Sequence, residues 1–126
     1  MFNATGFLTN AGVLLAAIVA GGLGSAVRLL ISHWNGRLPW GILVGNTLAS
    51  VIVSVATGPS MHPPAATILS LGLAGGLSTF STWAAQTVHF YRQGQSLKGN
   101  LNLLLNLGLP AIGAITGIIL SPLLLK

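Results

Sequence analysis

Hydroxyl and aromatic side chains gather in the middle of a long apolar segment. The stretch AGGLSTFST, residues 74–82, places four hydroxyls within six residues after two glycines. Polar groups inside a bilayer are costly and are therefore candidates for function. An interrupted helix there would free carbonyls to bind a cation and amides to face an anion. The alternative is a plain glycine hinge, although the crowded hydroxyls favour an interrupted helix.

Two aromatic residues accompany the hydroxyls. Phe80 and Trp83 are three residues apart, so they lie on one helix face. The edges of aromatic rings carry partial positive charge, and edges pointing into a narrow pore would attract a small anion. The alternative is that both rings are ordinary packing residues.

Amide and cationic side chains also stand in apolar segments. Asn46 either lines a polar path or hydrogen-bonds another helix. Asn102 and Asn106 are four residues apart on one face, where they would cap a helix or line a vestibule. We expect Arg28 to be structural, with its guanidinium reaching the interface or holding backbone carbonyls.

The absence of acids and thiols excludes much chemistry. The chain has no Asp, Glu or Cys, and its three His are dispersed. Paired-acid catalysis, an Asp-oriented triad, an acidic calcium or magnesium cage and a disulfide are therefore excluded. We expect no enzyme activity and no histidine metal site.

The composition is that of a membrane protein. Of 126 residues, 52% are hydrophobic and 4% are charged, and the mean hydropathy is +0.85. A soluble domain carries about a quarter charged residues. The five Lys and Arg form no clustered patch for nucleic acid, and their places at helix ends suit membrane anchoring.

Four segments approach the ~20 apolar residues that cross a bilayer. The uncharged N-terminal stretch argues against a cleaved signal peptide, so the first segment should be a true span. We expect one all-α domain over residues 1–126, with a hydrophilic loop at 92–100 and the third span broken at its centre. The expected spans are 11–32, 40–57, 65–91 and 101–125.

Small residues recur at helical spacing in three of these spans. The pairs are Gly21/Ser25, Gly72/Gly76 and Gly113/Gly117. Such pairs let helix backbones approach closely in lipid, so we expect them to mark helix contacts.

Three stretches together resemble the Fluc/CrcB family of fluoride channels. They are GGLGSAVR at 21–28, LPWG at 38–41 leading to Asn46, and GGLSTFST at 75–82. Their order and spacing extend over all four spans. The resemblance implies a four-helix subunit that works as an antiparallel dimer with two pores, in the cell inner membrane.

The resemblance also implies roles for individual residues. The third helix would break between Gly75 and Thr79, and backbone oxygens of Gly75 and Ser78 would hold a central sodium ion. Arg28 matches the first-helix arginine of the family. The residues expected along the fluoride path are Asn46, Phe80, Ser81, Thr82, Trp83, Asn102 and Asn106.

Some positions depart from the family pattern. Trp83 stands where the family has a second Phe, and Gln86 where it has Glu. Asn102 and Asn106 stand near the fourth-helix positions where the family has a Tyr or similar polar residue, followed by a Ser or other hydrogen-bonding residue. These departures bear on whether both pores of a homodimer conduct.

The expected function is passive fluoride export, which lowers cytoplasmic fluoride. The expected partners are fluoride, membrane lipid and a second copy or a related subunit. One alternative is a non-conducting or topology-fixed subunit of a heterodimeric channel. Another is a small multidrug-type transporter, which needs an ionisable membrane residue, usually Glu, that this chain lacks.

The basic residues also predict an orientation. Arg37, Arg92 and Lys98 follow the first and third spans, whereas Lys126 is on the other side. Arg28 would join the first group if its side chain reached outward. Because cytoplasmic loops collect Lys and Arg, both termini should face outward.

Overall fold

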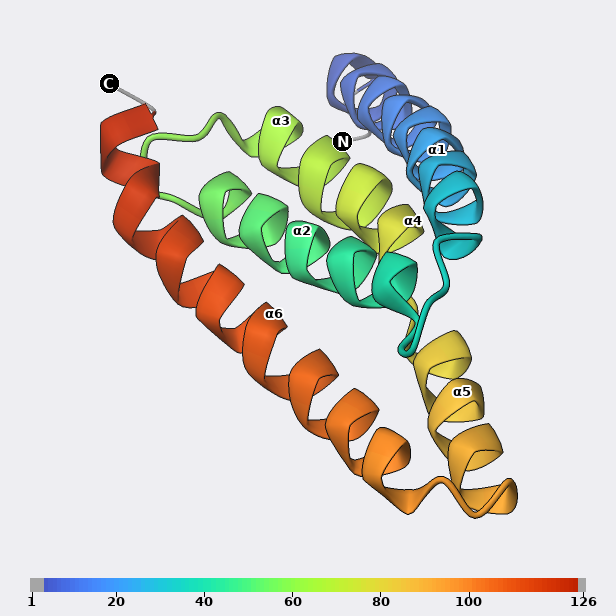
Figure 1. Ribbon diagram of the computed structural model, residues 1–126. Helices are drawn as coiled ribbons and strands as arrows, with labels where there is room; N and C mark the ends of the chain where they lie inside the picture. The colour runs from blue at the N-terminus through green and yellow to red at the C-terminus, as the bar shows by residue number, and fades with distance from the viewer. Residues whose placement is uncertain (1–3, 125–126) are drawn as a thin grey trace.

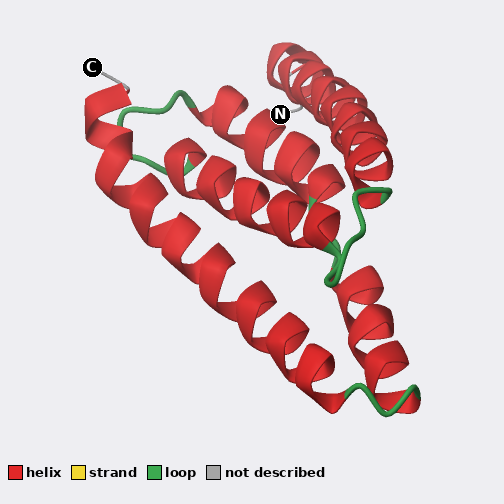
Figure 2. Cartoon of the chain, in the orientation of Figure 1, coloured by secondary structure: helices red, strands yellow, loops and turns green. Residues whose placement is uncertain are grey.

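The computed structural model describes residues 4–124, in which every regular element is a helix (Figure 2). The third span is built from several short helical pieces, of which η1 is π-helical. In chain order the elements are α1 Ala4–Ser32, α2 Trp40–Ala56, α3 Pro63–Thr67, η1 Ile68–Ala74, α4 Gly75–Leu77, α5 Phe80–Arg92 and α6 Ser96–Leu124 (Figure 1).

Three helical segments are long and apolar enough to cross a membrane. They are Leu8–Ser32, Pro63–Arg92 and Ser96–Leu124. The fourth apolar helix, α2, has 17 residues and is shorter. The chain is thus an all-helical integral membrane protein.

The predicted loop at 92–100 is wrong in its length. Helix α6 begins at Ser96, so the connection from α5 covers only residues 93–95. Polar residues at 96–100 form the first turn of α6 because a helix start outside the apolar layer tolerates polar side chains. The third span begins earlier than predicted, at Pro63, since proline fits the first turn of a helix. The expected end of the last span at Leu125 lies outside the described residues.

The helices pack in two groups that meet around the third span. Helix α1 lies along η1 and α4, whereas α2 lies along α6, and α5 packs against the first part of α6 (Figure 1). A small apolar core of Ala49, Ala74 and Leu77 joins α2 to η1 and α4. The residues at 78–79 therefore stand where both groups meet.

Glycines bring α1 and the third span into backbone contact. A Cβ on Gly76 would stand 2.1 Å from the Gly21 carbonyl oxygen, and one on Gly72 would stand 2.6 Å from that of Ala17. On the other side, a Cβ on Gly117 would stand 2.9 Å from the Val51 oxygen of α2. The predicted role of the small-residue pairs in close packing is confirmed.

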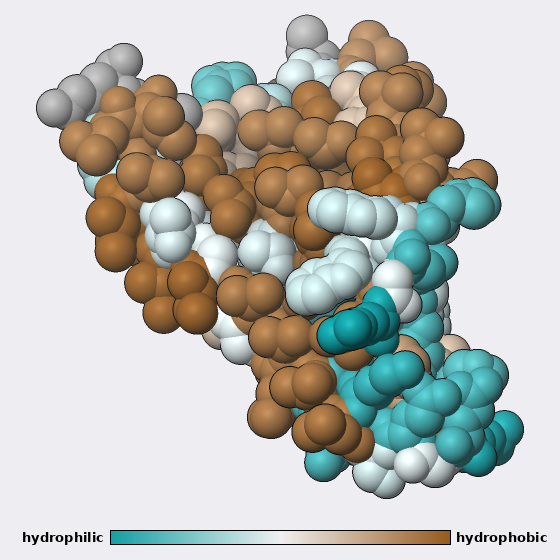
Figure 3. Space-filling view, viewed as in Figure 1, coloured by the Kyte–Doolittle hydropathy of each residue, from teal (hydrophilic) through white to brown (hydrophobic). Residues whose placement is uncertain are grey.

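Many large hydrophobic side chains are exposed on the surface. Hydrophobic residues cover much of the face shown in Figure 3, and hydrophilic residues gather along one side and at the end where α5 joins α6. Leucine and isoleucine side chains on the outer faces of α1 and α6 are largely exposed, as lipid contact requires.

Candidate functional site

Two residues of the third span leave the helical conformation. Ser78 has φ −80° and ψ 154°, and Thr79 has φ −154° and ψ 118°. Gly75 and Gly76 remain helical, although the predicted break included them. Helix α5 then begins at Phe80, where the Thr79 hydroxyl oxygen accepts a hydrogen bond from the Thr82 amide at 3.3 Å. A Thr cap of this kind satisfies one of the free amides at a helix start.

Asn46 of α2 pairs with the extended backbone. Its Oδ1 accepts from the Thr79 amide at 2.8 Å, and its Nδ2 donates to the Thr79 carbonyl at 3.3 Å. In a continuous helix the Thr79 amide would donate to Gly75, four residues earlier. Asn46 therefore takes the place of a helical partner, and the Gly75 carbonyl does not receive that bond.

An open groove of ≈ 260 Å³ lies beside this pairing. It brings together four of the predicted path residues from three helices. The lining residues are Asn46, Ser50, Ser78, Thr79, Phe80, Trp83, Asn106 and Pro110.

The other predicted path residues lie outside the groove. The Ser81 hydroxyl is 3.3 Å from that of Thr79 and is exposed. Thr82 lines a separate cavity that it shares with Arg28. Asn102 is 2% exposed between α5 and α6.

The aromatic pair forms an edge-to-face contact at the groove. The ring centroids of Phe80 and Trp83 are 5.2 Å apart at an interplanar angle of 80°. The predicted proximity of the two rings is confirmed. Phe80 is 75% exposed, whereas Trp83 is 9% exposed and its Nε1 donates to the Asn102 carbonyl at 3.1 Å. Phe80 thus presents an exposed ring, and the indole N–H of Trp83 is already bound.

Buried amides extend inward from the groove. Asn46 Nδ2 donates to Asn106 Oδ1 at 3.1 Å, and Asn106 Nδ2 donates to Asn102 Oδ1 at 3.1 Å. Asn102 Nδ2 in turn donates to the Thr87 hydroxyl at 2.8 Å. These contacts link α2, α6 and α5 in one continuous chain of hydrogen bonds.

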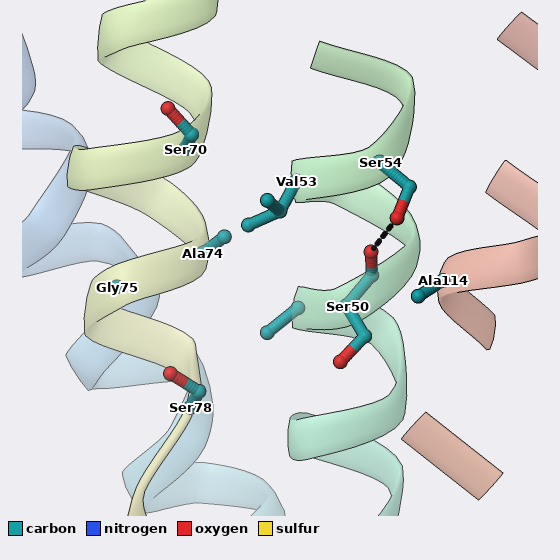
Figure 4. A pocket seen from close by; sticks show the side chains of 9 residues that line it. Ser50, Val53, Ser54, Ser70, Ala74, Gly75, Ser78 and Ala114 are labelled. Carbon is teal, nitrogen blue, oxygen red and sulfur yellow. Dashed lines mark hydrogen bonds between the residues drawn. The ribbon is translucent and has the colours of Figure 1, made fainter. Parts of the chain in front are cut away.

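A second cavity, of ≈ 350 Å³, lies between α2 and the third span. Gly75 and Ser78 line it from one side, facing Ser50 and Ser54 of α2 (Figure 4). The Ser50 and Ser54 hydroxyls donate to carbonyls one turn earlier in their own helix. Their oxygens are left as acceptors, which suits a hard cation.

Arg28 is tied to the helix just before the extended residues. Its Nε donates to the Gly76 carbonyl at 3.1 Å, and the Ser25 hydroxyl donates to the same oxygen at 3.4 Å. Of the two alternatives stated for Arg28, the structure shows the one in which it holds a carbonyl.

A family model described as "CrcB-like protein, Camphor Resistance (CrcB)" matches residues 15–118. The matched range contains the groove and all its lining residues. This chain belongs to the CrcB family.

Curated members of the family share about a third of its residues. The chain is 35% identical over 117 residues to the "Fluoride-specific ion channel FluC" of Clostridium novyi (strain NT), covering 83% of this chain and 91% of that protein. It is 35% identical over 105 residues to the protein of the same name from Shewanella baltica (strain OS185), covering 76% and 85%. The protein of that name from Clostridium perfringens (strain 13 / Type A) is 32% identical over 117 residues, covering 83% and 91%.

Two polar residues of this CrcB chain were missed by sequence reasoning. Thr87 is buried, and it accepts from Asn102 and donates to the Trp83 carbonyl at 2.9 Å. The available signal was its spacing of four residues from Trp83, which places both side chains on one face of a helix. Gln86 was noted only as a departure, but its buried Oε1 has no hydrogen-bond partner among the described residues.

Proposed function

We propose that this chain is a fluoride channel through which fluoride leaves the cell by passive diffusion. The proposal extends to a cell inner-membrane protein with four spans that works as an antiparallel dimer with two pores. The observation that carries it is the groove at the extended Ser78–Thr79 segment, where an amide and an exposed ring edge converge. The names of the curated relatives support the choice of ion.

The groove offers an anion two kinds of partner. The Phe80 ring edge carries partial positive charge and is 75% exposed. The Asn46 Nδ2 bond to the Thr79 carbonyl, at 3.3 Å, is the longer of its two bonds, and an ion would replace it first. Ser81 adds an exposed hydroxyl one residue beyond. With no Asp or Glu in the chain, no carboxylate repels the ion.

The proposed central sodium ion would be held by backbone oxygens of Gly75 and Ser78. The donor set fits, because both residues line a cavity that the Ser50 and Ser54 hydroxyls also line, and the Thr79 amide donates to Asn46 instead of the Gly75 carbonyl. When bound, the ion supplies positive charge at the centre of a protein without acids. Asn46 and Arg28 act on either side by holding the Thr79 and Gly76 backbone.

Ion efflux from liposomes tests the proposed function. Purified protein is expected to release fluoride, measured with a fluoride electrode, and to release chloride at least a hundredfold more slowly. Empty liposomes provide the control for leakage. Equal fluoride and chloride rates would contradict the selectivity, and no fluoride release would contradict the function of the chain on its own.

A second candidate is a topology-fixed subunit that pairs with a related chain. It is favoured by Trp83, whose indole N–H is bound to Asn102 so that this side chain is fixed in the packing. Co-expression with a related subunit would then give fluoride release that neither chain gives alone.

A further inference from the structure

We propose that Thr87, Asn102 and Asn106 are positioning residues that set which end of the Asn46 amide faces the Thr79 backbone. We call the chain Thr87–Asn102–Asn106–Asn46 the amide relay. None of the first three residues need contact the ion for this role. The inference rests on the proposed function only where ion flux is measured.

The polarity of the amide relay is set at Thr87. Its hydroxyl has one hydrogen, which it donates to the Trp83 carbonyl at 2.9 Å. A backbone carbonyl can only accept, so this hydrogen is committed. Toward Asn102 the Thr87 oxygen can therefore only accept, and the Asn102 amide must present its Nδ2, as observed at 2.8 Å.

Each asparagine then passes the polarity to the next. With Nδ2 toward Thr87, Asn102 turns its Oδ1 toward Asn106, which donates to it at 3.1 Å. Asn106 Nδ2 also donates to the Asn102 carbonyl at 3.1 Å, which fixes that end of the amide. The Oδ1 of Asn106 is left to accept from Asn46 at 3.1 Å.

The last member of the amide relay meets the extended segment. With Nδ2 toward Asn106, Asn46 presents Oδ1 to the Thr79 amide at 2.8 Å. A reversed Asn46 would set its Nδ2 against the Thr79 N–H. It would also set its Oδ1 against the Asn106 Oδ1, unless Asn106 reversed as well. Asn102 and Asn106 are 2% and 6% exposed, so bulk water cannot replace a lost partner.

The amide relay is also closed on helix α5. It starts at the Trp83 carbonyl in the first turns of α5 and ends at Thr79, whose hydroxyl caps the same helix. The first turns of α5 therefore contact both ends of the same series of hydrogen bonds, through Thr79 and through the Trp83 carbonyl. Loss of the Thr87 hydroxyl leaves the shape of the amide relay intact but frees the Asn102 amide to turn. Asn106 then keeps only the Asn102 carbonyl as an acceptor and loses the Asn102 Oδ1.

Amide exchange at Thr79 tests the inference without reference to flux. In Thr87→Val, which keeps the side-chain shape, the Thr79 amide is expected to exchange at least tenfold faster by NMR of 15N-threonine-labelled protein. Thr87→Ser should restore wild-type protection. Thr116→Val is the matched control, because Thr116 also donates to a carbonyl four residues earlier but lies on an exposed face.

Unchanged Thr79 protection in a folded Thr87→Val protein would overturn the inference. If Thr87→Val does not fold, Thr87→Ala replaces it, since the space left admits a water that can donate or accept and so frees the polarity. Thr79 exchange equal to wild type in that variant would equally overturn it.

Fluoride efflux provides the functional readout of the same variants. Thr87→Val is expected to lower fluoride release several-fold, and Thr87→Ser and Thr116→Val to keep it. If wild-type protein releases no fluoride while Thr79 exchange responds as expected, the proposed function fails and the amide relay stands. Normal flux with faster exchange would overturn the positioning role.

Discussion

At the scale of single residues, Phe80 and Trp83 are neighbours with different surroundings. The Phe80 ring is exposed at the groove, while Trp83 is buried and hydrogen-bonded to the α6 backbone. A phenylalanine at position 83 could not make that bond, because its ring has no donor. Trp83 thus ties α5 to α6, and the exposed ring of the pair is that of Phe80.

Substitution of the exposed ring separates its role from packing. Phe80→Ile is expected to lower fluoride efflux at least tenfold, because it removes the ring edge and keeps apolar bulk. Gel filtration should show the same assembly as wild type, since the side chain is 75% exposed in the single chain.

Phe90→Ile is the control for this substitution. Phe90 lies on the same helix, near Lys98, and does not line the groove. Its substitution should leave efflux within about twofold of wild type. Wild-type efflux in Phe80→Ile would place that ring outside the ion path.

At the scale of the elements, the sequence predicted an interruption in the third span but not the cause of the extended conformation found there. The predicted break included the two glycines, yet both stay helical, and Gly76 admits the backbone of α1. The extended conformation falls at Ser78 and Thr79, where Asn46 supplies the missing partner. That partner stands 33 residues earlier in the chain, and no local pattern relates the two positions.

The boundaries and the π-helical η1 were also beyond local reasoning. Hydropathy predicts where a chain crosses lipid, and it is silent on polar first turns such as that of α6. The spacing of Asn102 and Asn106 predicted a shared face. Whether that face meets an ion or another helix depends on tertiary packing, and the structure shows both amides buried.

The contact of α1 with the third span makes a sharp prediction about glycine. A Cβ on Gly24 would stand 2.3 Å from the Leu73 carbonyl oxygen and 3.0 Å from the Leu77 amide nitrogen. Both are backbone atoms and cannot turn away. Gly24→Ala is therefore expected to destabilise the protein by about 2 kcal/mol, measured by thermal unfolding in detergent.

Gly22→Ala is the matched control two residues earlier on α1. A Cβ there meets nothing within 4 Å, and alanine favours a helix over glycine by about 1 kcal/mol. We expect its melting temperature to equal or exceed that of wild type. Equal melting temperatures for both variants would mean that α1 does not pack this closely.

Across the whole molecule, positive charge is unevenly placed. Arg37 lies in the connection between α1 and α2, and Arg92 and Lys98 flank the connection between α5 and α6. Arg28 is bound to the Gly76 carbonyl and does not join them, which leaves three cations at these two connections. Lys126, expected on the other side, lies outside the described residues.

This asymmetry predicts a preferred orientation in cells. Because Lys and Arg are retained in the cytoplasm, Gln95→Cys should be labelled mainly from inside and Ser60→Cys mainly from outside. The natural chain has no cysteine, so it provides a background without labelling. Labelling of each site equally from both sides would instead show dual topology, as an antiparallel homodimer requires.

The pairing of Asn46 with Thr79 also bears on how the chain enters the bilayer during synthesis. A backbone amide and carbonyl without partners cost several kcal/mol each in hydrocarbon, so an extended segment cannot rest in lipid alone. Helix α2 leaves the ribosome before the third span, and its asparagine is therefore in the membrane when Thr79 arrives. Asn106 follows last, and its Oδ1 then accepts from the Asn46 amide. The order of the helices along the chain thus spares the nascent protein a stage at which its most polar backbone would face lipid unprotected.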